Sequence, residues 1–200
     1  METIGKILDG GTSSRPATSL DLSASGTSPS DRPDVPERYR QWRLDDYAPQ
    51  IVAQIQAWAA GPLWSLFLSG APGTRKSSVA AAIIGAARCR RQFCTPERTV
   101  SQIRALADWW IIQAKALPLL VLDDLASYRA TPHVHETLLL ILGARYDNCR
   151  KTVITSNVNL ADIGKWLDPR LADRLREGLV MFSGRESRRP TGNGDPSHAE

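Results

Sequence analysis

Short apolar runs alternate with longer segments of helical periodicity through the middle of the chain. Short β-type runs occupy 64–69, 117–122, 152–155 and 179–182, with a weaker one at 92–95, and the run at 117–122 is continuously apolar, as is typical of a buried β-strand. Helical spacing predicts helices at 51–60, 76–88, 100–115 and 132–148. A further helix is predicted between the capping pair Asp168-Pro169 and Gly178. Because strands that alternate with helices pair in parallel, the pattern predicts an α/β fold with a central parallel sheet of about five strands.

Both ends of the chain lack this pattern. Residues 9–36 are rich in Gly, Ser, Thr and Pro and carry few large apolar side chains, and residues 190–200 have the same character. Such segments bury too little apolar surface to offset the entropy lost on ordering. We therefore expect disordered tails at 1–35 and 190–200 around one domain at 36–189.

The composition fits a soluble protein, with 42% hydrophobic and 23% charged residues. No apolar run approaches the roughly 18–20 residues that a membrane-spanning helix needs. The N-terminus also lacks the basic start and apolar core of a secretory signal, so we expect a cytoplasmic protein without a membrane partner. The three cysteines form no C-x-x-C pair, which argues against a disulfide framework or a zinc site.

The net charge of +4 is compatible with nucleic-acid binding, and its distribution is more informative than its size. Arginines cluster at 88, 90, 91 and 98, and again at 185, 188 and 189. Each cluster is either a solvated basic edge or part of a track for single-stranded DNA.

An eight-residue stretch after the first predicted strand carries the strongest chemical signal. It reads GAPGTRKS and differs from the phosphate-binding loop G-x-x-x-x-G-K-[ST] only at Arg75, which replaces the second glycine. In such a loop the Lys76 ammonium reaches the β- and γ-phosphate oxygens and the Ser77 hydroxyl ligates Mg²⁺. A Cβ at position 75 resists the φ values that glycine adopts, so we expect a strained loop and weakened ATP binding. The residues expected to contact the nucleotide here are Gly70, Ala71, Pro72, Gly73, Thr74, Arg75, Lys76, Ser77 and Ser78.

Polar side chains follow two more of the predicted strands. Asp123 and Asp124 end the run LLVLDD, and Asn157 ends TVITSN. Parallel sheets bind ligands at the carboxyl edge of their strands, so these side chains should meet the phosphate loop there. Asp123 is then expected to hold Mg²⁺, Asp124 to orient or activate the attacking water, and Asn157 to contact the γ-phosphate or that water.

Arg170 and Arg174 lie four residues apart in the last predicted helix and so share one face of it. Two such guanidiniums suit the capture of phosphate charge, including that of a neighbouring subunit's nucleotide. The alternative is an exposed helix that carries Arg–Asp pairs.

The order of GAPGTRKSS, LLVLDDL, TVITSN, DPRLADRLREG and FSGRESRR resembles the AAA+ ATPase domain of bacterial helicase loaders of the DnaC/DnaI type and their IstB relatives. PERYR at 36–40 and LDDY at 44–47 are similar to the segment that those proteins place before their first helix, so the resemblance covers roughly 36–189. It implies a P-loop NTPase three-layer sandwich of the AAA+ type. It further implies that Asp123 and Asp124 are the Walker B acids and that Asn157 is sensor 1. It implies that Arg174, or else Arg170, is the arginine finger and that Arg188 is the second sensor.

The resemblance also implies a function. It predicts an ATP- and Mg²⁺-binding protein that self-associates with ATP and acts on DNA in replication, with single-stranded DNA and a replicative helicase or another DNA-processing protein as partners. Two alternatives remain: an IstB-like helper that delivers DNA to a transposase, and a non-hydrolysing scaffold in which Arg75 has impaired the loop. Asp124 is a second departure, because many AAA+ proteins carry Glu at that position.

Overall fold

The computed structural model describes residues 19–22, 32, 34–105, 107–127 and 131–183. Its strands form one parallel sheet in the order β2-β3-β4-β1-β5. Leu68 of β1 lies opposite Thr155 of β4, and Leu122 of β3 lies opposite Ile154. The predicted parallel five-stranded sheet is therefore confirmed. The strands are β1 (Ser65–Gly70), β2 (Arg91–Cys94), β3 (Leu119–Leu122), β4 (Lys151–Ser156) and β5 (Leu179–Ser183).

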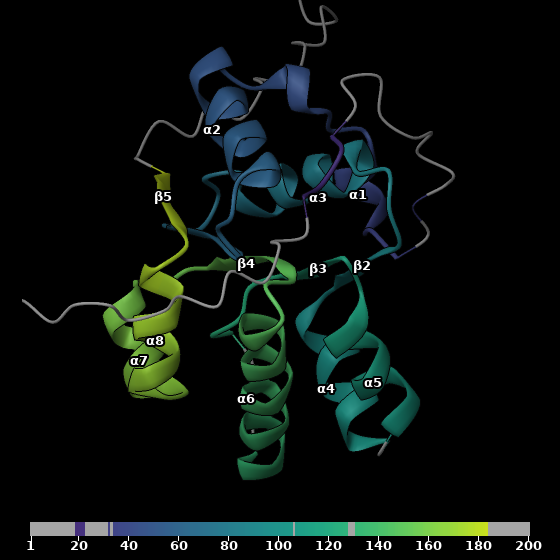
Figure 1. The fold of residues 1–200 in the computed structure, drawn as a ribbon, viewed down its shortest axis with the longest axis vertical. Coiled ribbons are helices and arrows are strands. Elements are labelled where there is room, and N and C mark those ends of the chain that lie inside the picture. Colours follow the sequence, from purple (N-terminus) through teal and green to yellow (C-terminus); the bar gives the residue numbers. More distant parts are fainter. Residues whose placement is uncertain (1–18, 23–31, 33, 106, 128–130, 184–200) are drawn as a thin grey trace, which may run out of the picture.

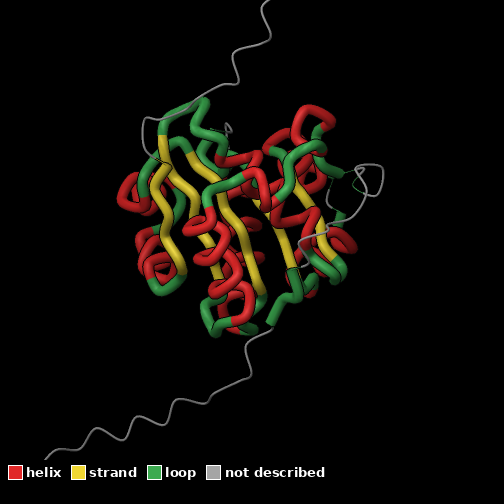
Figure 2. Tube along the Cα trace, turned by 90° about the horizontal axis from the view of Figure 1, so that it is seen from above, coloured by secondary structure: helices red, strands yellow, loops and turns green. Residues whose placement is uncertain are grey.

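Helices cover both faces of this sheet and make the predicted three layers (Figure 1). One face carries α1 (Glu37–Arg40), α2 (Pro49–Ala60) and α3 (Lys76–Ala86), with the short 3₁₀ helix η2 (Leu44–Asp46) between the first two. The other face carries α4 (Pro96–Arg104), α5 (Asp108–Ala116), α6 (Pro132–Asp147), α7 (Leu160–Trp166) and α8 (Pro169–Arg176). Figure 2 shows the same layers from above, with the strands side by side between the helices.

Each face of the sheet has its own apolar core, which explains why the strands are apolar without alternation. Leu66 and Leu68 of β1 pack into the core under α3, whereas Phe67 between them packs into the core under α6. All three side chains are buried. A strand buried on both sides is expected to read as a continuous apolar run, as the sequence does at 66–68.

Two helical predictions need correction. The single helix expected at 100–115 is two helices, α4 and α5. The first of them starts earlier than expected, with Thr95 accepting a hydrogen bond from the Arg98 N–H and Pro96 in the first turn. Ala107, just before α5, has a non-helical ψ of 77°. The second correction is α7, which the sequence did not predict. It is a short helix capped by Asn159, whose side chain accepts from the Asp162 N–H.

Part of the segment expected to be a disordered tail packs against the domain. Leu20 and Val35 are buried in the core beside α3, and the Leu20 N–H donates to the Ala59 carbonyl at 2.9 Å. Arg32 is only 2% exposed and lies against Gly85, where a Cβ would come within 2.2 Å of its guanidinium carbon. The packed part of the domain therefore begins ahead of residue 36. The other residues of the expected tails, and Arg188, lie outside the described residues.

Two buried cations hold the amino end of β4, away from the sheet edge that carries the polar strand ends. Arg145 of α6 donates to the Thr152 hydroxyl of β4 at 2.8 Å and to the carbonyls of Ala114 and Leu117 at 2.7 and 2.8 Å. The Lys151 ammonium donates to three carbonyls at the end of α2 and just beyond it, those of Trp58, Gly61 and Leu63. These bonds fix β4 to the helices on both faces. Within the described residues, no helix combines the length and apolarity that crossing a membrane requires.

Candidate nucleotide-binding site

The loop between β1 and α3 has the sharply turned backbone that the motif predicts. Thr74 closes a turn on the Ala71 carbonyl through both its N–H and its hydroxyl, at 3.4 and 2.8 Å. Gly73 has φ 84° and Arg75 has φ 64°, both in the left-handed region. Position 75 is therefore one that favours glycine, as the sequence indicated, and an L-residue there costs about 1–2 kcal/mol.

Lys76 is the first residue of α3, and its ammonium curls back over this loop. It donates to the carbonyls of Gly70 and Ala71 at 2.8 and 2.9 Å and to the Thr74 hydroxyl at 3.4 Å. The residue is only 7% exposed, and burial lowers its pKa, while the charges of Asp124 and Asp123 act in the opposite direction. All three acceptors are neutral groups of the same loop, which phosphate oxygens can replace as stronger partners.

Asp123 stands at the end of β3 as a buried carboxylate, 6% exposed. The Thr155 hydroxyl donates to its Oδ1 at 2.7 Å. Burial raises the pKa of Asp123, while hydrogen bonds from Thr155 and Ser77 and the charge of Arg38 lower it. A carboxylate beside a serine hydroxyl matches the oxygen ligands that Mg²⁺ prefers. The described residues contain no group of three or more His, Cys, Asp or Glu that could hold a metal ion.

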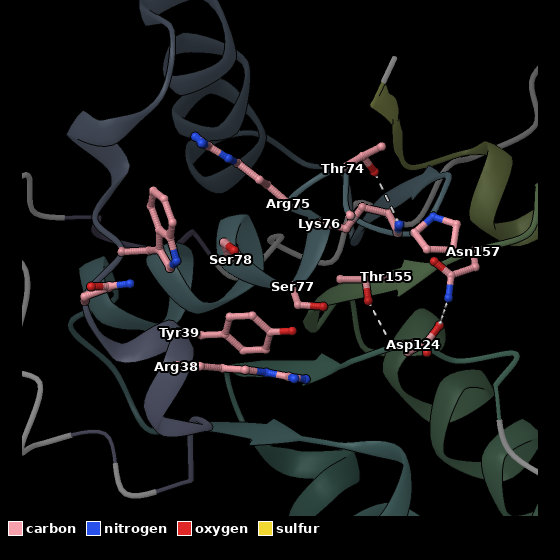
Figure 3. A pocket seen from close by; sticks show the side chains of 14 residues that line it. Arg38, Tyr39, Thr74, Arg75, Lys76, Ser77, Ser78, Asp124, Thr155 and Asn157 are labelled. Atoms are coloured by element: carbon pink, nitrogen blue, oxygen red, sulfur yellow. Dashed lines mark hydrogen bonds between the residues drawn. The ribbon is translucent and has the colours of Figure 1, made fainter. Parts of the chain in front are cut away.

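Asp124 and Asn157 meet across the ends of β3 and β4. The Asn157 amide donates to Asp124 Oδ1 at 2.8 Å, and the Asp124 N–H donates to the Thr155 hydroxyl at the same distance (Figure 3). Thr155 therefore links both acids to β4. The sequence expectation that these strand ends come together is correct in the structure.

A cavity of about 530 Å³ joins these groups, a size typical of small-molecule sites. The loop from Pro72 to Ser78, Asp124, Thr155 and Asn157 line one part of it (Figure 3). Its remaining wall comes from α1 and the residues that follow, namely Arg38, Tyr39, Gln41 and Trp42. The sequence analysis missed this wall, although the PERYR segment at 36–40 gave a signal for it.

Arginines of two different segments lie over aromatic rings at this wall. The Arg75 guanidinium carbon is 4.9 Å from the centre of the Trp42 ring, so the residue that replaces the loop glycine points away from Lys76. The Arg38 guanidinium carbon is 4.6 Å from the centre of the Tyr39 ring. Figure 3 shows the Arg38 side chain extending toward the same space as Ser77 and Asp124.

The two arginines of α8 do not line this cavity. Arg174 is half-buried, with its guanidinium carbon 4.7 Å from the centre of the Tyr146 ring of α6, and Arg170 is exposed. The helix does carry an Arg–Asp pair of the kind that the alternative expects, between Arg176 and Asp173. A contact of Arg170 or Arg174 with a nucleotide would therefore have to involve a second copy, and it stays a prediction.

The sheet order, the loop after β1 and the acids after β3 give the chain an α/β fold of the P-loop, AAA+ type. Solved structures share this fold. The crystal structure of the DnaC helicase loader is 24% identical with a TM-score of 0.66, over 74% of this chain and 100% of that one. The crystal structure of DnaI is 17% identical with a TM-score of 0.61, over 74% of this chain and 94% of that one.

The replication initiator DnaA, bound to AMPPCP and single-stranded DNA, is 16% identical with a TM-score of 0.63, over 74% of this chain and 50% of that one. At these identities the likeness shows the fold, and it confirms at that level the resemblance read from the motifs. No protein-family model matches the sequence, and no curated protein matches it.

Proposed function

We propose that this chain binds ATP with Mg²⁺ and acts on DNA in replication, as a helicase loader or a related accessory ATPase of the cytoplasm. One observation carries the nucleotide part: Lys76 and Ser77 after β1, Asp124 after β3 and Asn157 after β4 line one cavity, and Asp123 is hydrogen-bonded to Thr155 and Ser77 of its lining. The replication part is supported by the fold that the chain shares with a helicase loader and with a replication initiator.

Each of these side chains has a chemical role in the proposal. Lys76 exchanges its loop carbonyls for phosphate oxygens, and Ser77 and Asp123 hold the metal. Bound Mg²⁺ would neutralise phosphate charge as it builds up during hydrolysis. The Asn157 amide donates to Asp124 Oδ1. In the proposal the other carboxylate oxygen of Asp124 accepts a proton from the attacking water.

Single-stranded DNA is the nucleic-acid partner that we propose. A second cavity, of about 450 Å³, lies beside the edge strand β2 and is lined by Arg90, Arg91 and Arg98 together with Trp109. Trp109 is 62% exposed, which is an unusually large exposed fraction for so large an aromatic side chain. Arginines beside an exposed ring provide the charge and the stacking platform that single strands bind.

The proposed protein partners are a replicative helicase, or another DNA-processing protein, and further copies of this chain when ATP is bound. The ATP-binding residues would be the same in a helper that delivers DNA to a transposase. Co-purification with a helicase or with a transposase separates these two functions.

Equilibrium binding of a fluorescent ATP analogue in the presence of Mg²⁺ tests the nucleotide site. The wild type should bind, and Lys76→Ala should weaken binding by about 10- to 100-fold, as for the loss of a charge-assisted hydrogen bond. Lys165→Ala is the matched control, because Lys165 is exposed and pairs with Asp162 on α7, outside the cavity. Failure of the wild type to bind would overturn the proposal and favour the scaffold alternative.

A further inference from the structure

Arg38 presents a positive charge to the nucleotide cavity from outside the phosphate loop. It belongs to the four-residue helix α1, its side chain lines the cavity, and the residue is exposed. Burial raises the pKa of Asp123, and the Arg38 charge is among the influences that lower it. The guanidinium therefore lies within electrostatic reach of the acid expected to hold the metal, on the same side of the cavity as Ser77 and Asp124 (Figure 3).

The surroundings of Arg38 leave its hydrogen-bond donors available. Its guanidinium carbon lies over the Tyr39 ring, 4.6 Å from the ring centre, and it forms no ion pair within 4.0 Å with any carboxylate of the described residues. A guanidinium held over a ring loses less freedom on binding than an extended side chain that moves freely. Arg38 is thus already positioned over the cavity and can engage an anion without breaking a salt bridge.

The other cations near the site have different positions. Lys76 lies over the loop, Arg75 lies over Trp42, and Arg174 lies over Tyr146 outside the cavity. Of the two arginines of the described residues that line the cavity, Arg38 and Arg75, Arg38 is the one whose charge acts on the pKa of Asp123.

We infer that Arg38 contacts the terminal phosphate of ATP and acts as an arginine finger supplied by the same chain. The inference rests on the proposed function, since it requires that the cavity binds ATP. An arginine that reaches the γ-phosphate stabilises its charge and lets a site distinguish ATP from ADP. A finger within the chain would make this distinction independent of assembly with a neighbouring copy.

The test compares the affinities for ATP and for ADP, both with Mg²⁺, measured by titration calorimetry. Arg38→Ala should weaken ATP binding about tenfold or more and ADP binding less than about threefold, because ADP lacks the phosphate that Arg38 contacts. Arg38→Lys should give an intermediate loss for ATP, since it keeps the charge without the planar fork. Arg104→Ala, which removes an exposed arginine from α4 outside the cavity, should leave both affinities unchanged.

Two further measurements make the result decisive. The wild-type ratio of the two affinities should stay the same when the protein is diluted until self-association disappears. Thermal unfolding of Arg38→Ala and Arg38→Lys should show unchanged midpoints, because the residue is exposed. If the midpoint falls for Arg38→Ala alone, the ATP and ADP affinities of Arg38→Lys test the inference instead.

The inference is overturned if Arg38→Ala weakens ATP and ADP equally, or leaves ATP affinity at the wild-type value. It is also overturned if the preference for ATP vanishes on dilution, because the finger would then come from a neighbour. A wild type that binds neither nucleotide would instead refute the proposed function itself.

Discussion

Replacing Arg75 by glycine restores the common phosphate-loop sequence. Three contributions to the free energy of unfolding follow from this change, one stabilising and two destabilising. Relief of the left-handed conformation, φ 64°, should stabilise the folded state by about 1–2 kcal/mol. Removal of the guanidinium from the Trp42 ring, 4.9 Å from its centre, should cost about 0.5–1 kcal/mol. The added freedom of glycine in the unfolded chain should cost about another 0.4–1 kcal/mol.

These terms nearly cancel, so we expect Arg75→Gly to change the free energy of unfolding by less than about 1 kcal/mol. Arg75→Ala is the matched control: it keeps a Cβ at the left-handed position and lacks the guanidinium, so it should destabilise by about 0.5–1 kcal/mol. Urea unfolding measures both changes. In a Trp42→Leu background the ring is already absent, and Arg75→Gly should there be more favourable by about 0.5–1 kcal/mol than in the wild type.

The same reasoning revises the expectation for ATP binding. The loop holds the left-handed conformation in this structure, so its cost falls on folding rather than on binding. Arg75→Gly should therefore change ATP affinity by less than about threefold, a shift below about 0.7 kcal/mol at about 1.4 kcal/mol per decade. A tenfold tightening would show that the loop is strained further when ATP binds. Equal stabilities of Arg75→Gly and Arg75→Ala in both backgrounds would refute the assigned strain.

Three further predictions concern other parts of the molecule. Arg174→Ala should keep the wild-type ATP affinity but lose ATP-dependent self-association in analytical ultracentrifugation, and unchanged assembly would remove it as a finger for a neighbour. Replacing Arg88, Arg90 and Arg91 by Ala should weaken binding of single-stranded DNA and reduce its salt slope by about 0.7 for each phosphate that is no longer neutralised; an unchanged slope would identify a solvated edge. Burial lowers the pKa of Lys151 to about 8, so between this value and its unfolded value of about 10.4 the unfolded chain binds more protons. The free energy of unfolding of the wild type should therefore rise from pH 8 to pH 10 relative to Lys151→Met in urea titrations, and a parallel pH dependence would contradict this.

The polar centre of the site was predictable because its determinants are local. The motif around Lys76 fixes the loop, and a continuous apolar run places Asp123 at the end of a buried strand. The rule that parallel strands present their carboxyl ends at one edge then brings Asn157 to the same place. None of these steps needs knowledge of long-range packing.

The wall formed by α1 and the packing of the N-terminal segment depend on long-range contacts, which the sequence pattern does not report. Leu20 stands almost alone among small and polar residues, yet it is buried in the core beside α3, and its N–H donates to the Ala59 carbonyl near the end of α2. Arg32 would count as a solvated residue by its type, but the missing side chain of Gly85 on α3 makes room for its guanidinium. Composition therefore predicted a tail where docking on α3 produces structure.

Backbone conformation connects the two departures from the common AAA+ motifs. Of the non-glycine residues with positive φ in the described part of the chain, Arg75 and Asp124 line the nucleotide cavity, while Cys149 lies in the turn before β4. Backbone strain of this kind concentrates at functional sites, so it independently supports the proposal that this cavity is a functional site. Asp tolerates the left-handed region better than most residues, so the φ of 49° at position 124 favours the short acid over Glu. The hydrogen bond from Asn157 then holds that carboxylate at the cavity.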